Sequence, residues 1–269
     1  MQEIFGYFLA SLIGISLGLI GGGGSILTVP VLVYIMGVSP TLSTAYSLFI
    51  VGITALVGSL TYFQKKLISL KTAIVFSIPS FIAVFLVRKY VVPAIPKEIV
   101  QLGNFTLTRD ILLMLIFAIL MIFASVSMIK DKKKNNGNTD ENQEPVFNFP
   151  LIFVEGLVVG AITGLVGAGG GFMIIPALVV FAKLPMKMAV GTSLLIIAAK
   201  SLIGFVGDVM NPELTIDWSL LLIFSLVATI GIFVGSYLSN FIPGAKLKKA
   251  FGWFVAVMGV YILLRELLK

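Results

Sequence analysis

The sequence predicts an all-α, polytopic helical membrane protein built from two inverted repeats, each with a glycine-broken helical hairpin and three transmembrane helices. Three observations support this fold class: apolar residues make up 58% of the 269 residues, charged residues make up only 12%, and one glycine-rich block occurs twice. Soluble domains have roughly 45 to 50% apolar and about 25% charged residues. The mean hydropathy is +1.10, and the long apolar runs differ from the weak alternating pattern of a membrane β-barrel.

The glycine-rich block defines the repeat. Its first copy, GLIGGGGSILTVP, begins at Gly18, and its second copy, GLVGAGGGFMIIP, begins 146 positions later at Gly164. The similarity continues at the same offset, because Ala-Tyr-Ser-Leu at 45–48 pairs with Gly-Thr-Ser-Leu at 191–194. Glycine clusters interrupt helices, since glycine loses backbone entropy and supplies no packing side chain. One unit is therefore used twice, with a helix break at the same place in each copy.

Each half contains five apolar segments in the same order. The segment after each glycine cluster has about twelve residues, or roughly 18 Å of helix, which is shorter than the roughly 30 Å hydrocarbon core. We expect helices at 4–20, 25–36, 41–63, 69–92 and 108–129, and again at 150–166, 172–183, 187–206, 217–239 and 247–268. The expected domains are a first transmembrane repeat over 1–129, a polar cytoplasmic linker over 130–148 and a second transmembrane repeat over 149–269.

The basic residues indicate how the halves are oriented. If each glycine-broken pair of segments crosses the membrane once, the basic residues divide evenly between the two sides. If each pair is a hairpin, twelve lysines gather on one side, and six residues remain opposite: Arg88, Lys89, Lys97, Arg109, Arg265 and Lys269. The positive-inside rule favours the hairpin. This predicts inverted halves, a multi-pass protein of the cell (plasma or inner) membrane with both termini extracytoplasmic, and an outer acidic loop with Asp208, Glu213 and Asp217.

Inverted repeats with broken helices at mid-membrane are typical of secondary transporters. The backbone amides that open a half-helix carry partial positive charge, so the expected substrate is a small anion. Nearby hydroxyls would complete its shell, although serine and threonine in membrane helices also bond back to their own carbonyls. The candidate substrate-binding residues are Gly21, Gly22, Gly23, Gly24, Ser25, Tyr46, Ser47, Gly167, Gly169, Gly170, Gly171, Thr192, Ser193 and Lys200.

Lys200 is the only basic residue that the sequence places deep in an apolar segment. It lies seven residues after Ser193, which puts both on one helical face. An ionisable group inside a membrane is costly and usually functional, but Lys200 has the alternatives of reaching outward or pairing with Asp208. Glu155, about one turn inside its segment, is a candidate for coupling to a proton or sodium ion, or else an interfacial residue.

Some of these features have a simpler structural explanation, and several other functions are disfavoured by the composition. The spaced glycines at 14 and 18, at 156, 160 and 164, and at 231 and 235 are expected to let helices pack closely. The chain has no histidine and no cysteine, which disfavours an enzyme and predicts no cofactor and no metal site. The net charge of +7 follows from the cytoplasmic bias, so lipid is the expected contact and nucleic acid is not. A passive anion channel and a membrane scaffold remain as alternatives.

The two glycine-proline blocks, the Ala/Gly-x-Ser-Leu elements and the Leu-Lys-Lys-Ala-Phe-Gly stretch at 247–252 resemble the TauE/SafE sulfite exporter (TSUP) family over nearly the whole chain. The resemblance implies a carrier for sulfur-containing anions such as sulfite, organosulfonates or thiosulfate. It points to residues 21–25 and 167–171, to Ser47 and to Ser193. The first half departs from the pattern, because Tyr46 stands where the second half has Thr192, and an insertion at 97–108 replaces a counterpart of the 247–252 stretch.

Overall fold

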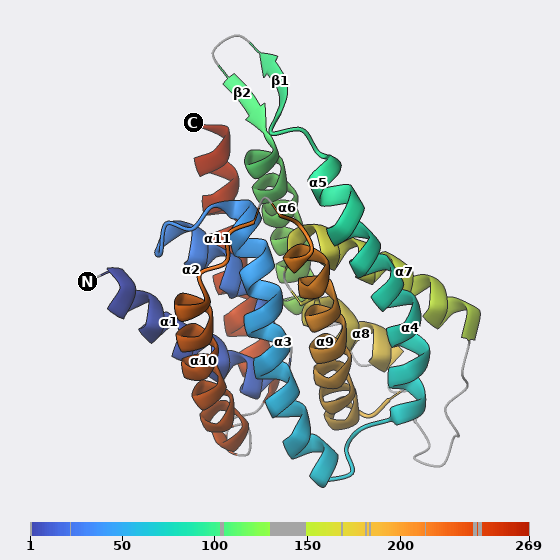
Figure 1. The fold of residues 1–269 in the computed structure, drawn as a ribbon. Coiled ribbons are helices and arrows are strands. Elements are labelled where there is room, and N and C mark those ends of the chain that lie inside the picture. The colour runs from blue at the N-terminus through green and yellow to red at the C-terminus, as the bar shows by residue number, and fades with distance from the viewer. Residues whose placement is uncertain are drawn as a thin grey trace.

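The structure, a computed structural model, is a bundle of α-helices with one short β-hairpin at one end (Figure 1). It describes residues 2–21, 23–102, 105–129, 149–167, 169–180, 182, 184–212, 214–238, 241 and 244–268, so the predicted linker over 130–148 lies outside the described residues. Within this part of the chain, five helices are long and apolar enough to cross a membrane: Pro40–Gln64, Leu70–Ala94, Arg109–Val126, Met186–Val209 and Trp218–Leu238. The all-α, polytopic class is confirmed.

The helices match the predicted segments in order and within a few residues at their ends. The first half has α1 (Gln2–Ile20), the 3-10 helix η1 (Gly23–Leu27), α2 (Thr28–Tyr34), α3 (Pro40–Gln64), α4 (Leu70–Leu86), the π-helix η2 (Val87–Val91), α5 (Val92–Ala94) and α6 (Arg109–Ile129). The second half has α7 (Phe149–Val166), α8 (Gly171–Val180), α9 (Met186–Val209), α10 (Trp218–Leu238) and α11 (Gly244–Leu267).

Both predicted helix breaks are present. Gly21 after α1 has φ of +79° and Gly167 after α7 has φ of +71°, a conformation that side chains disfavour and that ends the helix. After each break the chain folds back on the helix it has just left. A Cβ at Gly24 would lie 2.8 Å from the carbonyl oxygen of Ile13, and a Cβ at Gly170 would lie 2.2 Å from Cγ2 of Thr163. Each glycine-broken pair is therefore a hairpin.

Equivalent helices of the two halves run in opposite directions. Gly52 of α3 faces Leu202 of α9, and Gly58 faces Leu194, so the numbers rise along one helix as they fall along the other. In Figure 1, α3 accordingly starts at the top of the bundle and α9 starts at the bottom. Helices α6 and α11 are antiparallel too, because Gly252 lies against Met128 and Gly259 against Met121. This arrangement is consistent with the predicted inversion.

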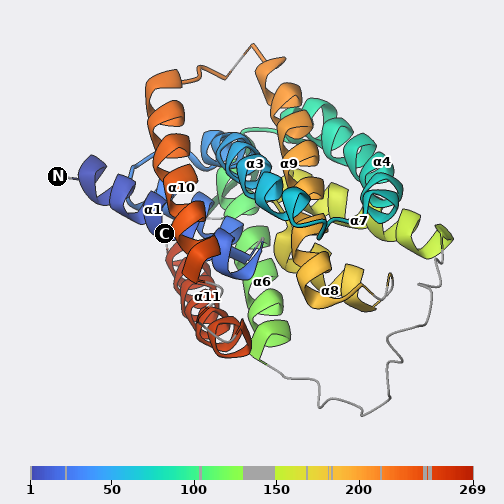
Figure 2. The ribbon, with the colours of Figure 1, turned by 90° about the horizontal axis from the view of Figure 1, so that it is seen from below.

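The remaining helices pair across the halves through glycine. Gly14 and Gly18 of α1 meet the backbone of α10, where a Cβ at either position would lie 1.9 or 2.4 Å from a carbonyl oxygen. Gly156 and Gly160 of α7 approach the backbone of α4 in the same way. These spaced glycines act as the packing residues that the sequence suggests. Figure 2 shows α3 and α9 between the α1/α10 pair and the α4/α7 pair.

Two features of the first half were not predicted. The insertion at 97–108 forms an antiparallel hairpin of β1 (Glu98–Leu102) and β2 (Phe105–Thr108), which projects beyond the end of the bundle (Figure 1). The end of α4 widens into η2, a π-helical turn that includes Arg88. Single π-helical turns are frequent at functional sites.

Candidate functional site

The two helix breaks meet between the central helices. A Cβ at Gly169 of the second break would lie 3.3 Å from Cβ of Ser25 in η1, 2.6 Å from Cγ1 of Val51 in α3 and 3.3 Å from Cγ2 of Ile197 in α9. Val51 and Ile197 occupy equivalent positions of the two repeats, since they are 146 residues apart. The structure thus brings Ser25 and Gly169, both predicted from sequence, to the place where the repeats face each other.

Each break also rests against the central helix of the other half. A Cβ at Gly21 would lie 2.5 Å from Cγ1 of Val190 in α9, and a Cβ at Gly167 would lie 2.6 Å from Cα of Thr44 in α3. Gly21 and Gly167 are equivalent residues, and so are Thr44 and Val190. The breaks are therefore positioned by α3 and α9, and a shift of either helix would move the break that lies on it.

Lys200 reaches from α9 to the second break. Its side chain is 1% exposed, its Nζ donates a 2.9 Å hydrogen bond to Oγ1 of Thr163 in α7, and a Cβ at Gly170 would lie 2.7 Å from that Nζ. The ammonium does not reach outward, and Asp208 pairs with another residue, Arg88. Among the described residues, Lys200 is thus hydrogen-bonded to a neutral hydroxyl. A buried positive charge adjoins the second break.

The first half has no such charge at the equivalent place. Thr54 stands where the second half has Lys200, and its Oγ1 donates to the backbone oxygen of Ile50 at 2.7 Å. The site is therefore asymmetric in charge although its backbone is repeated. An anion would be attracted to the second break more strongly than to the first.

The two predicted serines of the central helices differ. Ser47 lies on the α3 face between Thr44 and Val51, both of which contact the second break, and its buried Oγ has no hydrogen-bond partner in the described part of the chain. Ser193 of α9 bonds back to the carbonyl of Val190 at 2.8 Å. Ser47 is therefore available to a ligand, whereas the Ser193 hydroxyl is used within its own helix.

Tyr46 and Thr192 anchor loops. Oη of Tyr46 accepts a 2.5 Å hydrogen bond from the amide of Asp217, just before α10, and Oγ1 of Thr192 accepts a 2.9 Å hydrogen bond from the amide of Ser69, just before α4. These two contacts are equivalent in the two halves. Each of these side chains ties the start of a helix in the opposite half to a central helix, which gives the hydroxyls a structural role.

We expect Tyr46→Phe and Thr192→Val each to lower stability by about 0.5 to 1.5 kcal/mol, the usual value of one hydrogen bond, and to leave anion affinity unchanged. Thermal unfolding and substrate binding on the same purified variants check this. A loss of affinity without a loss of stability would place these hydroxyls in the binding site instead.

The other predicted residues are spread over the breaks and the surface. Gly23 begins η1, Gly24 packs on α1 and Gly171 begins α8, whereas Gly22 lies outside the described residues. Glu155 is partly exposed on α7, next to the exposed Val154 and close to the exposed Val158. It therefore lies toward the outer surface of the bundle rather than at the meeting point of the breaks.

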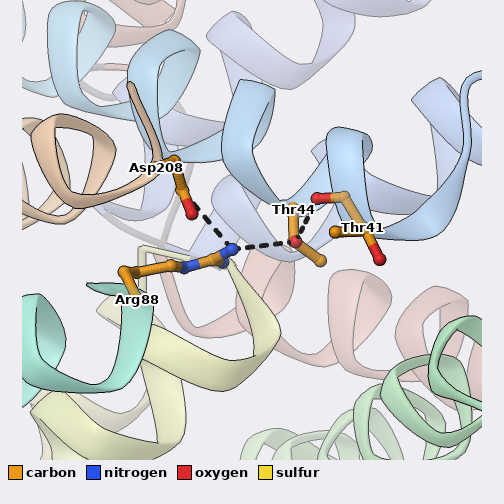
Figure 3. Close-up of polar contacts among 4 residues, drawn as sticks. All are labelled: Thr41, Thr44, Arg88 and Asp208. Carbon is orange, nitrogen blue, oxygen red and sulfur yellow. Dashed lines mark hydrogen bonds and ion pairs between the residues drawn. The ribbon is translucent and has the colours of Figure 1, made fainter. Parts of the chain in front are cut away.

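Arg88 is buried inside the bundle, although the sequence predicts it outside the membrane. Its side chain is 1% exposed, its Nη1 donates a 3.0 Å hydrogen bond to Oγ1 of Thr44, and the same Nη1 lies 3.5 Å from Oδ2 of Asp208 (Figure 3). Asp208, expected in an outer loop, is 3% exposed near the end of α9. The signal for Arg88 was its position inside the apolar segment predicted at 69–92.

A chain of contacts connects Arg88 to a surface cavity. Thr44 donates to the carbonyl of Thr41 at 2.7 Å, and Oγ1 of Thr41 donates to Oδ1 of Asp110 in α6 at 2.5 Å. Thr41 and Asp110 both line a cavity of about 460 Å³ at the end of the bundle that carries the β-hairpin. The other lining residues are Ser39, Lys97, Glu98, Thr108, Arg109, Asn211 and Leu214.

Comparison with known proteins supports a membrane transporter. The family model described as "Sulfite exporter TauE/SafE" matches residues 7–262. A protein of Xylella fastidiosa (strain 9a5c) named "Probable membrane transporter protein" is 26% identical over 258 residues, which cover 95% of this chain and 92% of that protein. The "Probable membrane transporter protein YunE" of Bacillus subtilis (strain 168) is 28% identical over 212 residues, covering 74% of this chain and 75% of its own length. No solved structure matches.

Proposed function

Because the chain belongs to the sulfite exporter TauE/SafE family of membrane transporters, we propose that it is a secondary transporter for a small sulfur-containing anion. The substrate class is sulfite, an organosulfonate or thiosulfate. The mechanism is alternating access in the cell (plasma or inner) membrane, in which the two halves rock about the place where the glycine breaks meet.

The buried ammonium of Lys200 supports the anionic substrate most directly. A lysine at the centre of a membrane helix costs about 2.5 to 3.5 kcal/mol on insertion scales, and the neutral Thr163 does not compensate its charge. A small anion bound at the second break would do so. The amides that open α8 after Gly170, the hydroxyl of Ser47 and the ammonium together provide donors for several oxygens.

The repeated contacts support alternating access. Gly21 rests on Val190 and Gly167 rests on Thr44, so each break is held by the central helix of the opposite half. A carrier has to open first to one side of the membrane and then to the other. Two repeats with equivalent contacts between break and central helix allow two equivalent conformations, one open to each side. A proton or sodium ion is the proposed coupling ion, with Glu155 as the candidate carboxylate.

Flux into proteoliposomes tests the proposal. Sulfite, sulfoacetate, thiosulfate and sulfate are added one at a time outside vesicles that contain the purified protein, with the same anion or no anion inside. We expect saturable uptake of at least one sulfur anion and acceleration by counterflow. Uptake that is much faster and shows no counterflow would indicate a channel, and no uptake of any anion would indicate a scaffold.

The orientation that we propose predicts a labelling pattern. The chain has no cysteine, so single cysteines introduced at Asn136, Asn211, Pro243 and the C-terminus can be labelled one at a time. Asn136 and Pro243 are expected to be cytoplasmic, and Asn211 and the C-terminus outside, because this gathers 12 of the 19 basic residues on the cytoplasmic face. Labelling of Asn136 and Asn211 from the same face would contradict inverted halves.

A further inference from the structure

Arg88 presents an unpaired edge inside the bundle. Its side chain is buried, yet only Nη1 has a partner, while Nε and Nη2 have none among the residues that the structure describes. A guanidinium carries five N–H donors in a rigid plane, and a buried donor without an acceptor costs free energy. Three of the five N–H groups belong to Nε and Nη2, and two of these three point in parallel from the edge that the two nitrogens share. A buried charge with a whole edge unpaired suits a ligand better than it suits a purely structural ion pair.

Asp208 does not occupy that edge. Its Oδ2 lies 3.5 Å from Nη1, longer than the roughly 2.7 to 2.9 Å of a charge-assisted hydrogen bond, and Nη1 is also bonded to Thr44 (Figure 3). The carboxylate therefore compensates the charge of Arg88 without the bidentate geometry that arginine and a carboxylate can adopt. The edge that is suited to two acceptor oxygens stays unused.

Arg88 lies between the surface cavity and Lys200. On one side, Thr44 connects it through Thr41 to the cavity, and α3 then runs from Thr41 toward Val51 at the second break. On the other side, Asp208 precedes the end of α9 by one residue, and Lys200 lies eight residues earlier on the same helix, about 12 Å along its axis. Going from the cavity end of the bundle toward the second break, Arg88 is thus reached first and Lys200 second.

We propose that Arg88 is a second anion-binding residue, whose Nε/Nη2 edge holds two oxygens of the transported anion on its way between the cavity and Lys200. This inference rests on the proposed function. The ligand class is an anion with two oxygens on one central atom, such as sulfite or a sulfonate, because only such a group matches the fork of donors. A halide ion is a single acceptor atom, so it cannot place a separate acceptor on each of the two parallel donors.

Arg88→Lys tests whether the two parallel donors of the guanidinium are needed, because lysine keeps the positive charge and removes the planar edge. We expect the concentration of sulfite that half-saturates uptake to rise at least tenfold, while inhibition of that uptake by chloride changes less than threefold. Lys89→Gln is the matched control: Lys89 is adjacent, and its Nζ lies over the rings of Phe85 and Tyr90. It is expected to behave like the parent. Unchanged sulfite affinity in Arg88→Lys would overturn the proposal.

Asp208→Asn separates binding from folding. The negative charge of Asp208 beside Arg88 repels an anion on the Nε/Nη2 edge, so Asp208→Asn should strengthen sulfite binding at least threefold in the purified protein. If the pair is only structural, the same change should lower thermal stability and leave sulfite affinity equal or weaker, which would also overturn the proposal. A parent protein that takes up no anion of the panel would instead contradict the proposed function itself.

Discussion

Replacing Gly170 by valine is expected to abolish uptake of the sulfur anion while the protein remains in the membrane. Gly170 has φ of +70°, where a side chain costs roughly 1 to 2 kcal/mol. A Cβ there would also lie 2.2 Å from Cγ2 of Thr163 and 2.7 Å from Nζ of Lys200. Either the backbone of the break or the ammonium of Lys200 must therefore be displaced. Valine adds two methyl groups to this clash and is stiff at χ1. Uptake by proteoliposomes and the amount of folded protein in detergent are the measurements.

Gly37 supplies the control. It has φ of +72°, but a Cβ at this position would meet nothing within 4 Å. Gly37→Ala therefore isolates the backbone cost, and we expect it to keep uptake with about 1 kcal/mol less stability. Gly170→Ala carries the same backbone cost together with the contact on Thr163. If Gly170→Ala and Gly37→Ala transport equally well, close approach at the second break is not required for transport.

Lys200→Met is expected to weaken anion binding by about 1.5 to 3 kcal/mol, which is roughly 10- to 150-fold, because one charge-assisted hydrogen bond is lost. Methionine is similar in shape and has no charge to insert, so the variant should express at least as well as the parent. The affinity for sulfite and the thermal stability are measured on the same purified protein. Arginine at this position should rescue only part of the affinity, because its planar fork differs from a compact ammonium.

Lys187→Met is the matched control, since Lys187 is exposed near the start of the same helix α9. It should leave the affinity at the parent value. An unchanged affinity in Lys200→Met would remove Lys200 from the binding site. A loss of stability in Lys200→Met with unchanged affinity would show that its bond to Thr163 serves packing alone.

The fold could be predicted because its signals are local. Apolar runs define the helices, and clustered glycines define the breaks, so the predicted ends agree with α1, α3 and α7 to within two residues. Helix α9 was predicted to end at 206 and continues to Val209. It extends because the charge of Asp208, which suggested a loop, is compensated by Arg88 inside the bundle.

The site could be predicted only in part. Gly170 and Ser25 belong to the repeated glycine-rich block, and Lys200 is a charge inside an apolar segment, so the sequence marks all three. The structure places them at the breaks. The hydroxyls of Tyr46 and Thr192 come from the same motif but bond loop amides, and sequence does not reveal the direction of a side chain. Arg88 and Asp208 are 120 residues apart in the chain. Their burial depends on how α4 packs on α9, which no local pattern encodes.

The pairing of helices across the halves says something about how such a chain can arise. Helix α1 packs on α10 and α7 packs on α4, so the glycine-lined face of a helix in each half is buried against a helix of the other half. Neither half alone could bury these glycine-lined faces. Two copies of an ancestral gene product of half this length, inserted in opposite orientations, could make the same contacts as a homodimer. Gene duplication and fusion would then fix the orientations, after which the first copy could gain Arg88 and the second could gain Lys200 without a matching change in the other copy.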